Sequence, residues 1–554
     1  MKLNNMKLNN IHFTINKKSK KSKTSKNNNK KKSIKQFIIP FLHTTKINLE
    51  KNISCCLSYA KNQYNKNIIK EIQSSFLKDK TPNIRSVNLQ LNSKDSQTII
   101  LVPIKNKSSS KLIEDIRLAG SGLYNYLKNN NYLNNSIGLL NLVSYNEAFL
   151  EGLLLTSYSF QKYKKKKESH YSFKLYFPKL EKENLEMIKN LLIKTDAVFL
   201  TRDLVNEPNN KLSVVSFIKT IRDNISKEKL PLKITVLDES QLKNLGMNLL
   251  VSVGQGSTPD YKSKLMILEY APYIKTTNKS KKTKTKKIKS TKKTKRSNSK
   301  KKLSIAKSIT NPDYVLLGKG VIFDTGGINL KTYSGIHEMK CDMAGAALVS
   351  SFIMGYAKMK GKQKVIALIP LAQNAIGNKA SISGDVIKAY NGKTVEIINT
   401  DAEGRLLLAD CLSYASEEYP NAKLIDFATL TGQQENLSCK MFSNVVSNHL
   451  PLEKEIIKAG ESSQELVVSL PYMKEDCLKY LESDTADLRN VAKKCRGQIL
   501  TSSVFLGEFI KKTTKWAHLD IAGPTWEMSS IKPYMPGEGS GYGVRLLFKM
   551  LLIK

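Results

Sequence analysis

The chain has 554 residues, enough for two domains around a large hydrophobic core, and its 40% hydrophobic content is typical of a globular enzyme. No apolar run reaches the ~18 residues that a membrane-spanning helix needs, and no apolar segment typical of a secretory signal follows the first lysines, so we expect a cytoplasmic protein without a membrane partner. The net charge of +43 would ordinarily indicate a nucleic-acid partner, but more than half of the excess lies in two lysine-rich runs at residues 1–36 and 275–307.

The first part of the chain divides into a basic tail and a small domain. Residues 1–36 contain twelve lysines, no acidic residue and no hydrophobic periodicity, which predicts a disordered tail. Such a tail is either an inert solvated extension or a targeting or polyanion-binding segment. Residues 37–195 contain a buried strand at 98–103 and helical patterns at 110–118 and 146–163, which predict a smaller N-terminal α/β domain.

The second part is predicted to be a larger catalytic domain, residues 196–554. A linker helix at 196–205 is ended by Asn206-Glu207-Pro208. Strand patterns at 233–237, 265–270, 314–317, 364–369 and 424–428 then alternate with helices, which predicts an α/β fold with a mostly parallel sheet covered on both faces. Residues 275–307 hold sixteen Lys or Arg and no acid, and we interpret them as a disordered surface insertion.

Two stretches of the larger domain concentrate carboxylates in glycine-rich turns. Asn399-Thr400-Asp401-Ala402-Glu403-Gly404-Arg405-Leu406 stands where a strand pattern at 394–398 passes into a helix that runs to about residue 416. Residues 318–331 follow the strand at 314–317 and contain Asp324, and Asp342 opens an alanine-rich helix. Burying four carboxylates together requires compensating positive charge, which two divalent cations would provide.

Cysteines and histidines do not provide an alternative metal site. The seven cysteines have no CxxC spacing, so we expect reduced thiols and neither a zinc finger nor a disulfide framework. The six histidines are scattered and form no HExxH motif. Any catalytic metal must therefore be held mainly by oxygen ligands.

These stretches closely resemble the leucyl (cytosol) aminopeptidases, which are dinuclear-metal exopeptidases whose hallmark Asn-Thr-Asp-Ala-Glu-Gly-Arg-Leu is present at 399–406 without change. Segments 202–208, 245–247, 253–257 and 516–523 are similar to other blocks of that family. The resemblance covers roughly residue 151 to the C-terminus and is interrupted once, between 270 and 314.

The resemblance implies a role for each residue of the site. Asp324 and Glu403 would bridge two divalent ions, Zn²⁺ or Mn²⁺; Lys319 and Asp342 would complete one metal site and Asp401 the other. Lys319 can bind a metal only as a free amine, so a nearby dication must depress its pKa. Lys331 would stabilise the tetrahedral intermediate, and Arg405 would hold a bicarbonate that acts as a proton shuttle.

The substrate pocket also follows from the resemblance. Its candidates are Met339, Asn399, Thr429, Gly432, Ala522 and Thr525. Two neighbouring segments depart from the family pattern: Gln433-Gln434-Glu435-Asn436 replaces small or apolar residues, and residues 492–498 replace a run of small ones. We therefore expect substrate specificity and subunit packing to differ from the family more than the chemistry does.

The function that we expect is a metalloaminopeptidase that removes leucine and other bulky apolar residues from peptides with a free N-terminus, assembled as a homohexamer. One alternative is a nucleic-acid-binding or architectural protein that retains the fold, with non-specific polyanion contacts through the basic runs. These runs lack the interleaved aromatic residues that stack on bases, and their lysines could equally reflect AT-rich codons. A second alternative is a dipeptidase for Cys-Gly or glutathione conjugates.

Overall fold

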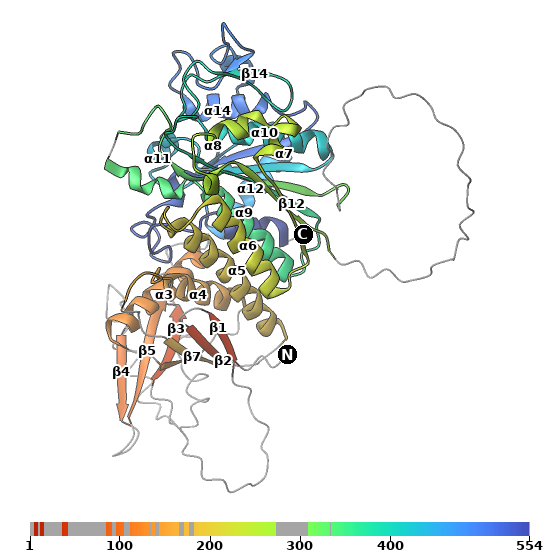
Figure 1. Cartoon of the computed structure of the whole chain (residues 1–554). Coiled ribbons are helices and arrows are strands. Elements are labelled where there is room, and N and C mark those ends of the chain that lie inside the picture. The colour runs from red at the N-terminus through yellow and green to blue at the C-terminus, as the bar shows by residue number, and fades with distance from the viewer. Residues whose placement is uncertain are drawn as a thin grey trace, which may run out of the picture.

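The computed structural model describes residues 5–8, 11–15, 36–42, 85–90, 96–104, 111–131, 134–138, 143–165, 171–176, 182–272, 309–332 and 334–552. They form a smaller N-terminal unit and a larger catalytic unit, drawn at the bottom and top of Figure 1. The insertion predicted at 275–307 lies outside the described residues. No helix in the described ranges is both long enough and apolar enough to cross a lipid bilayer.

The described part of the N-terminal unit combines a mixed sheet with two helices. Its strands pair in the order β1-β2-β7-β6-β3-β5-β4, with antiparallel pairs at the two edges and parallel pairs between them. The elements are β1 (Asn5–Leu8), β2 (Ile11–Ile15), β3 (Gln36–Leu42), β4 (Arg85–Gln90), β5 (Ser96–Ile104), α3 (Leu112–Asn129), β6 (Asn134–Gly138), α4 (Val143–Thr156) and β7 (Tyr171–Tyr176). The predicted strand at 98–103 and the two predicted helices correspond to β5, α3 and α4.

The prediction of a disordered tail over residues 1–36 is wrong for two short segments, since β1 and β2 are strands of this sheet. In β2 the residues Ile11, Phe13 and Ile15 alternate with His12 and Thr14. Alternation of this kind is a strand signal, but it covers only five residues and is obscured by the surrounding lysines and asparagines. Gln36 is the first residue of β3, and the rest of that tail lies outside the described residues.

The catalytic unit is built on a nine-stranded, mostly parallel sheet within the described chain. Its order is β17-β16-β19-β15-β10-β12-β9-β8, with β11 paired to β12. Strands β19, β15, β10 and β12 are parallel to one another, and β9 is antiparallel to both β12 and β8. Strand β16 is antiparallel to β19 and parallel to β17. The strands are β8 (Leu232–Leu237), β9 (Lys264–Tyr270), β10 (Tyr314–Gly318), β11 (Gly320–Asp324), β12 (Val365–Asn374), β15 (Lys423–Ala428), β16 (Ser443–Ser447), β17 (Val467–Ser469) and β19 (Lys515–Asp520).

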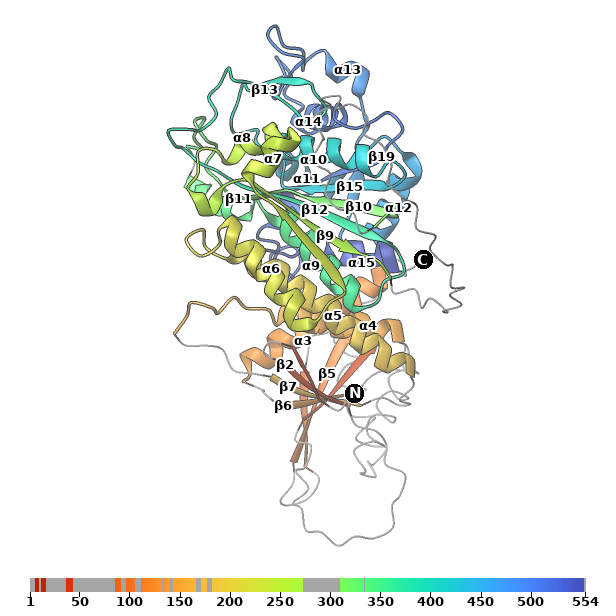
Figure 2. The same cartoon turned by 45° about the vertical axis from the view of Figure 1, so that its right-hand side comes forward.

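Helices cover both faces of this sheet, as the sequence predicts, and Figure 2 shows one group above it and one group below. Toward the N-terminal unit lie α5 (Lys182–Asn206), α6 (Val214–Glu228), α9 (Ala344–Lys358), α12 (Leu450–Ser463) and α15 (Val544–Leu552). On the other face lie α7 (Glu239–Leu245), α8 (Asn248–Gly254), α10 (Gly404–Glu418), α13 (Lys474–Leu478) and α14 (Gln498–Gly507). Remaining elements are α11 (Gly432–Ser438), a small sheet of β13 (Val386–Lys388), β14 (Thr394–Glu396) and β18 (Leu488–Arg489), and the 3₁₀ helices η2 (Pro259–Tyr261), η3 (Ser334–Cys341) and η4 (Gly523–Thr525).

The sequence explains the central elements. Strand β10 is apolar and buried at every position, as strands covered on both faces are. Helix α9 is buried from Ala344 to Ala357, because alanine, glycine and apolar residues occupy its whole circumference. Helix α5 is longer than the predicted linker, but it ends at Asn206, two residues before Pro208, as expected for a proline stop.

Candidate functional site

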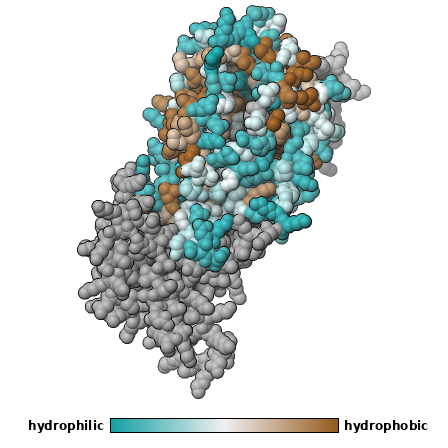
Figure 3. All heavy atoms as spheres, turned by 90° about the vertical axis from the view of Figure 1, so that its left-hand side faces the viewer, coloured by the Kyte–Doolittle hydropathy of each residue, from teal (hydrophilic) through white to brown (hydrophobic). Residues whose placement is uncertain are grey.

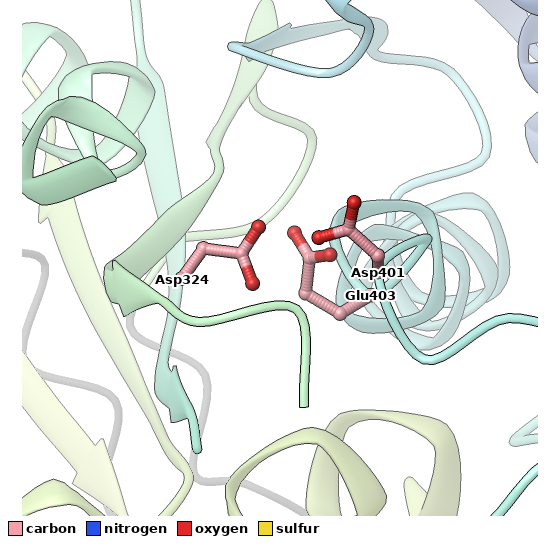
Figure 4. Close-up of side chains that lie close together, drawn as sticks. All are labelled: Asp324, Asp401 and Glu403. Atoms are coloured by element: carbon pink, nitrogen blue, oxygen red, sulfur yellow. The ribbon is translucent and has the colours of Figure 1, made fainter. Parts of the chain in front are cut away.

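The site lies at the carboxyl edge of the parallel strands. Lys319 follows β10, Asp324 ends β11, Thr429 follows β15, and Asp401 and Glu403 precede α10. Carboxyl ends of parallel strands meet at one edge of a sheet, and there ligands of α/β proteins commonly bind. Figure 4 shows the carboxylate of Asp324, on the strand side, facing those of Asp401 and Glu403 at the start of the helix.

Two lysines connect four carboxylates into one cluster. Lys319 Nζ lies 2.6 Å from Asp342 Oδ1 and 3.0 Å from Glu403 Oε1. Lys331 Nζ lies 2.9 Å from Asp324 Oδ2 and 2.5 Å from Asp401 Oδ1. One carboxylate oxygen each of Asp324, Asp401 and Glu403 lie within 4.8 Å of one another, a spacing that suits a shared cation.

The cluster is buried and carries more negative than positive charge. Burial raises the pKa of Asp324, and burial together with the charge of Glu403 raises that of Asp401. Burial also raises the pKa of Asp342, and its Oδ2 accepts no hydrogen bond from the described residues. Four carboxylates and two ammonium groups leave a deficit of positive charge, so the residues present fit divalent cations.

The pKa of Lys319 is shifted by the same carboxylates. Burial alone would lower its pKa, but the facing carboxylates Asp342 and Glu403 outweigh burial and raise it. The depressed pKa expected for a metal-ligating amine therefore requires the dication itself. Lys319 also donates to the carbonyl of Thr429 at 2.8 Å, which orients its amine.

Glycines allow the close approach of these groups. A Cβ at Gly404 would lie 2.6 Å from Lys319 Nζ, so only glycine at the start of α10 leaves room for that amine. Gly327 has φ +67°, and a Cβ there would lie 2.8 Å from Thr400 Oγ1. The turn after Asp324 can thus pack directly against the hallmark turn.

Arg405 lies beside the cluster on the first turn of α10. It is buried, and burial lowers its pKa to about 10. Its Nη1 donates to the carbonyl of Asn490 at 2.9 Å, while its Nε has no acceptor among the described residues. A buried guanidinium with an unused donor fits a small anion.

The predicted pocket residues lie in three places. Thr429 and Asn399 contact the cluster directly, since Thr429 Oγ1 donates to Asp342 Oδ1 at 2.7 Å and Asn399 Oδ1 accepts from the backbone N–H of Asp401 at 2.8 Å. Gly432 begins α11, and Ala522 and Thr525 stand at and within η4, which packs on α11. Met339 lies half-buried in η3.

The two segments that depart from the family pattern contact each other. The side-chain amide of Gln433 donates to the carbonyl of Arg496, and its Oε1 accepts from the backbone N–H of Gln498 at 2.8 Å. Gln434 is buried and accepts from the backbone N–H of Gly523 at 2.5 Å. The polar side chains that replace small or apolar residues next to Gly432 therefore have hydrogen-bond partners within the chain.

The sequence analysis missed several residues that support the site. Asn374 donates to Asp324 Oδ1 at 2.8 Å and to the carbonyl of Thr400 at 3.0 Å. Asn490 donates to the carbonyl of Asn399 at 2.7 Å. Asn374 ends β12, so its place at the end of a strand next to the site could have indicated it, whereas nothing near Asn490 in the sequence did.

This fold and this carboxylate-lysine cluster together fit a metal site at the carboxyl edge of an α/β sheet. The family model described as "Cytosol aminopeptidase family, catalytic domain" matches residues 199–285 and 299–548. The chain belongs to this family, and it is accordingly an exopeptidase of the leucyl aminopeptidase type.

Individual relatives agree with that assignment. A probable cytosol aminopeptidase of Geotalea uraniireducens is 37% identical over 419 residues, covering 73% of this chain and 74% of the relative. One from Clostridium perfringens is 35% identical over 421 residues, covering 75% and 76%. Among solved structures, the bottromycin maturation enzyme BotP in complex with Mn has a TM-score of 0.71 at 22% identity, covering 94% of this chain and 99% of that one, a similarity of fold.

Proposed function

We propose that this protein is a two-metal aminopeptidase that releases N-terminal residues from peptides, with leucine and other bulky apolar residues preferred. The observation that carries the proposal is the buried cluster of four carboxylates and only two lysines, which has fewer positive than negative charges. Lys319, Asp324, Asp342, Asp401 and Glu403 are the candidate ligands, and Zn²⁺ or Mn²⁺ the candidate ions. When bound, the ions would supply Lewis acidity toward the scissile carbonyl and a more acidic attacking water.

The chain's own residues have separate tasks in this proposal. Asp324 and Glu403 each interact electrostatically with both lysines and are the candidates for the shared ligands. Lys331 is less buried than Lys319 and can direct its ammonium group toward charge that develops on the substrate oxygen. The unused Nε of Arg405 is the candidate donor to bicarbonate, which would carry a proton.

Substrate selection follows from the same site. When bound, the ions would also hold the free α-amino group of the substrate, so a peptide with a blocked N-terminus would be a poor substrate. Thr429, Gly432, Ala522 and Thr525 line the candidate side-chain pocket together with Met339 and Asn399. Thr525 turns its hydroxyl back to the carbonyl of Ile521 at 2.5 Å, so its methyl group remains for an apolar substrate side chain.

The test is hydrolysis of leucine p-nitroanilide by purified protein with added Mn²⁺ or Zn²⁺, beside the N-acetylated anilide. Release from the free amine alone supports the proposal, and equal release from the acetylated compound contradicts it. Cys-Gly as a competing substrate distinguishes the dipeptidase alternative, which predicts a higher kcat/KM for Cys-Gly than for Leu-Gly.

We also propose a cytoplasmic homohexamer. Its support is the number of large apolar side chains that the described surface exposes, among them Ile328, Leu330, Leu437 and Met441, each about half exposed. Apolar patches lie among hydrophilic residues on the catalytic unit in Figure 3. Exposed apolar patches often mark subunit contacts. Light scattering on active enzyme tests this, and a monomeric mass would contradict it.

Polyanion contact is a second candidate function, supported by the net charge of +43. The run 275–307 connects the ends of two strands, because β9 ends at Tyr270 and β10 begins at Tyr314. A variant that joins Ile274 to Ser308 should keep peptidase activity and lose most nucleic-acid binding measured at low salt. Intact protein that binds no nucleic acid at low salt would contradict this candidate.

A further inference from the structure

Three polar side chains are buried together in the centre of the catalytic sheet. Asp426 on β15 and His518 and Asp520 on β19 each have no exposed surface. Asp426 and His518 are opposite each other in the parallel pairing of the two strands, and His518 Nδ1 lies 2.5 Å from Asp426 Oδ1. Trp516 Nε1 donates to the other oxygen, Asp426 Oδ2, at 2.7 Å. Burying two carboxylates in a sheet core is costly unless hydrogen bonds and a cation compensate them.

Asp520 joins two segments that carry candidate pocket residues. Its Oδ2 accepts a hydrogen bond from Thr431 Oγ1 at 2.7 Å. Its Oδ1 accepts from the backbone N–H of Leu430 at 3.2 Å and from that of Ala522 at 3.3 Å. One carboxylate therefore fixes the turn that follows β15 relative to the turn that follows β19.

The first of these turns also contacts the metal-site candidates. Thr429 accepts from Lys319 Nζ through its carbonyl and donates to Asp342 through its hydroxyl. Leu430 and Thr431, which Asp520 holds, are the next two residues, and Gly432 follows them. The separation between the pocket wall and the carboxylate cluster thus depends on the position of this turn.

His518 acts on Asp520 electrostatically. Burial raises the pKa of Asp520, and the charge of His518 acts against that rise. Burial would lower the pKa of His518, but Asp426 outweighs burial and raises that pKa. The other charged group facing His518 is Arg405, from α10. Three donors point at the two oxygens of Asp520. An ionised carboxylate suits them, because both of its oxygens accept hydrogen bonds.

We propose that Asp520, backed by His518 and Asp426, is a positioning residue that sets the dimensions of the substrate side-chain pocket. The proposal rests on the proposed function, in which Thr429, Gly432, Ala522 and Thr525 line that pocket. Asp520 touches none of the reacting groups. Its effect is on selectivity among N-terminal residues, because it sets the distance between the two walls.

The test compares Thr431→Val, which removes one donor to Asp520 at nearly constant volume, with Thr431→Ser, which keeps the hydroxyl. We compare kcat/KM for leucine amide with kcat/KM for alanine amide. Thr431→Val should lower the leucine-to-alanine ratio of these values by about tenfold, because a side-chain pocket discriminates by roughly that factor per methylene group. The loss should appear mainly in KM for leucine amide, with metal content unchanged. Thr431→Ser should retain the wild-type ratio, and Asp520→Asn should reproduce or exceed the effect of Thr431→Val.

Asp410→Asn is the matched control. Asp410 on α10 is also fully buried and accepts backbone N–H groups of two segments, Leu250 at 3.0 Å and Tyr390 at 2.8 Å, but neither segment carries a pocket candidate. The Asp410→Asn substitution should lower the melting temperature without changing the leucine-to-alanine ratio of kcat/KM. A wild-type ratio in Thr431→Val, or an equal fall in Asp410→Asn, would overturn the proposal. Wild-type protein that hydrolyses neither amide would instead refute the proposed function itself.

Discussion

Two buried charge clusters of this protein differ in how their charges are balanced. The interdomain cluster consists of Glu114 and Arg117 on α3, Glu151 on α4 and Arg545 on α15. Arg117 Nε lies 2.6 Å from Glu151 Oε2, and Arg545 lies 3.2 Å from both Glu151 oxygens. Acids and bases are equal in number, and Glu465 and Lys532 at its margin add one of each sign.

The pKa shifts separate the two clusters. Burial would raise the pKa of Glu151, but Arg545 and Arg117 outweigh it and lower that pKa well below its usual range. In the catalytic cluster the outcome is opposite, since burial prevails and the pKa values of Asp324, Asp342 and Asp401 are all raised. A cluster whose charges are balanced within the chain depends on each of its members, whereas a cluster with fewer positive than negative charges fits a cationic ligand.

The largest expected effect is that of metal removal. Chelation should reduce peptidase activity to background, and Mn²⁺, Zn²⁺ or Co²⁺ should restore it, because the catalytic cluster is short of positive charge. Asp324→Ala and Glu403→Ala should be the most damaging ligand substitutions, measured by activity together with metal content. Full activity in thoroughly demetallated protein would remove the distinction between the two clusters.

The interdomain cluster should respond to substitution and not to metal. Glu151→Gln leaves two buried guanidinium groups without their shared acceptor, and breaking such a pair costs about 3–5 kcal/mol of unfolding free energy. Chemical denaturation of the metal-loaded protein measures this loss. Metal content per folded molecule should remain that of the wild type, and a parallel loss of metal would mean that the two clusters are coupled.

Lys331 tests whether a lysine of the catalytic cluster acts in catalysis or only balances charge. Lys331→Ala should lower kcat by about 10²-fold while metal content stays at the wild-type value, as is typical when one donor to a developing oxyanion is removed. A proportional fall in metal content would show that Lys331 holds the site together. Lys331→Arg is the control that retains the charge.

The smallest expected effect concerns Asp410, a buried carboxylate that accepts hydrogen bonds from backbone N–H groups. Burial raises its pKa to about 7. Because this value exceeds the ~3.9 of the unfolded chain, the group's contribution to stability is complete below pH ~4 and is lost as pH rises toward 7. The free energy of unfolding should therefore fall with pH over this window less steeply in Asp410→Asn than in the wild type. If thermal or urea denaturation gave the same slope of unfolding free energy against pH for both proteins, the raised pKa of Asp410 would be contradicted.

Local patterns in the sequence were sufficient to predict the central strands and the carboxylate cluster of the catalytic unit. The apolar runs that became β9, β10 and β15 are buried on both faces, and such runs identify central strands without tertiary information. The hallmark at 399–406 and the turn around Asp324 predicted a carboxylate cluster, because like charges in ordered turns need cations. Strand β2 was missed, since five alternating residues carry too little signal within a lysine-rich tail.

Only the tertiary structure decided which groups support that cluster. Asn374, Asn490 and Asp520 come from three separate strand ends or turns, and each acts through two or three hydrogen bonds that have no sequence periodicity. The same holds for the contact between Gln433 and the 496–498 segment, which joins two departures from the family pattern. Residue types and spacing determine the chemistry that a site can perform, because ligands must have suitable atoms. Distances between groups far apart in the chain depend on how the strands and helices pack, and no local pattern encodes them.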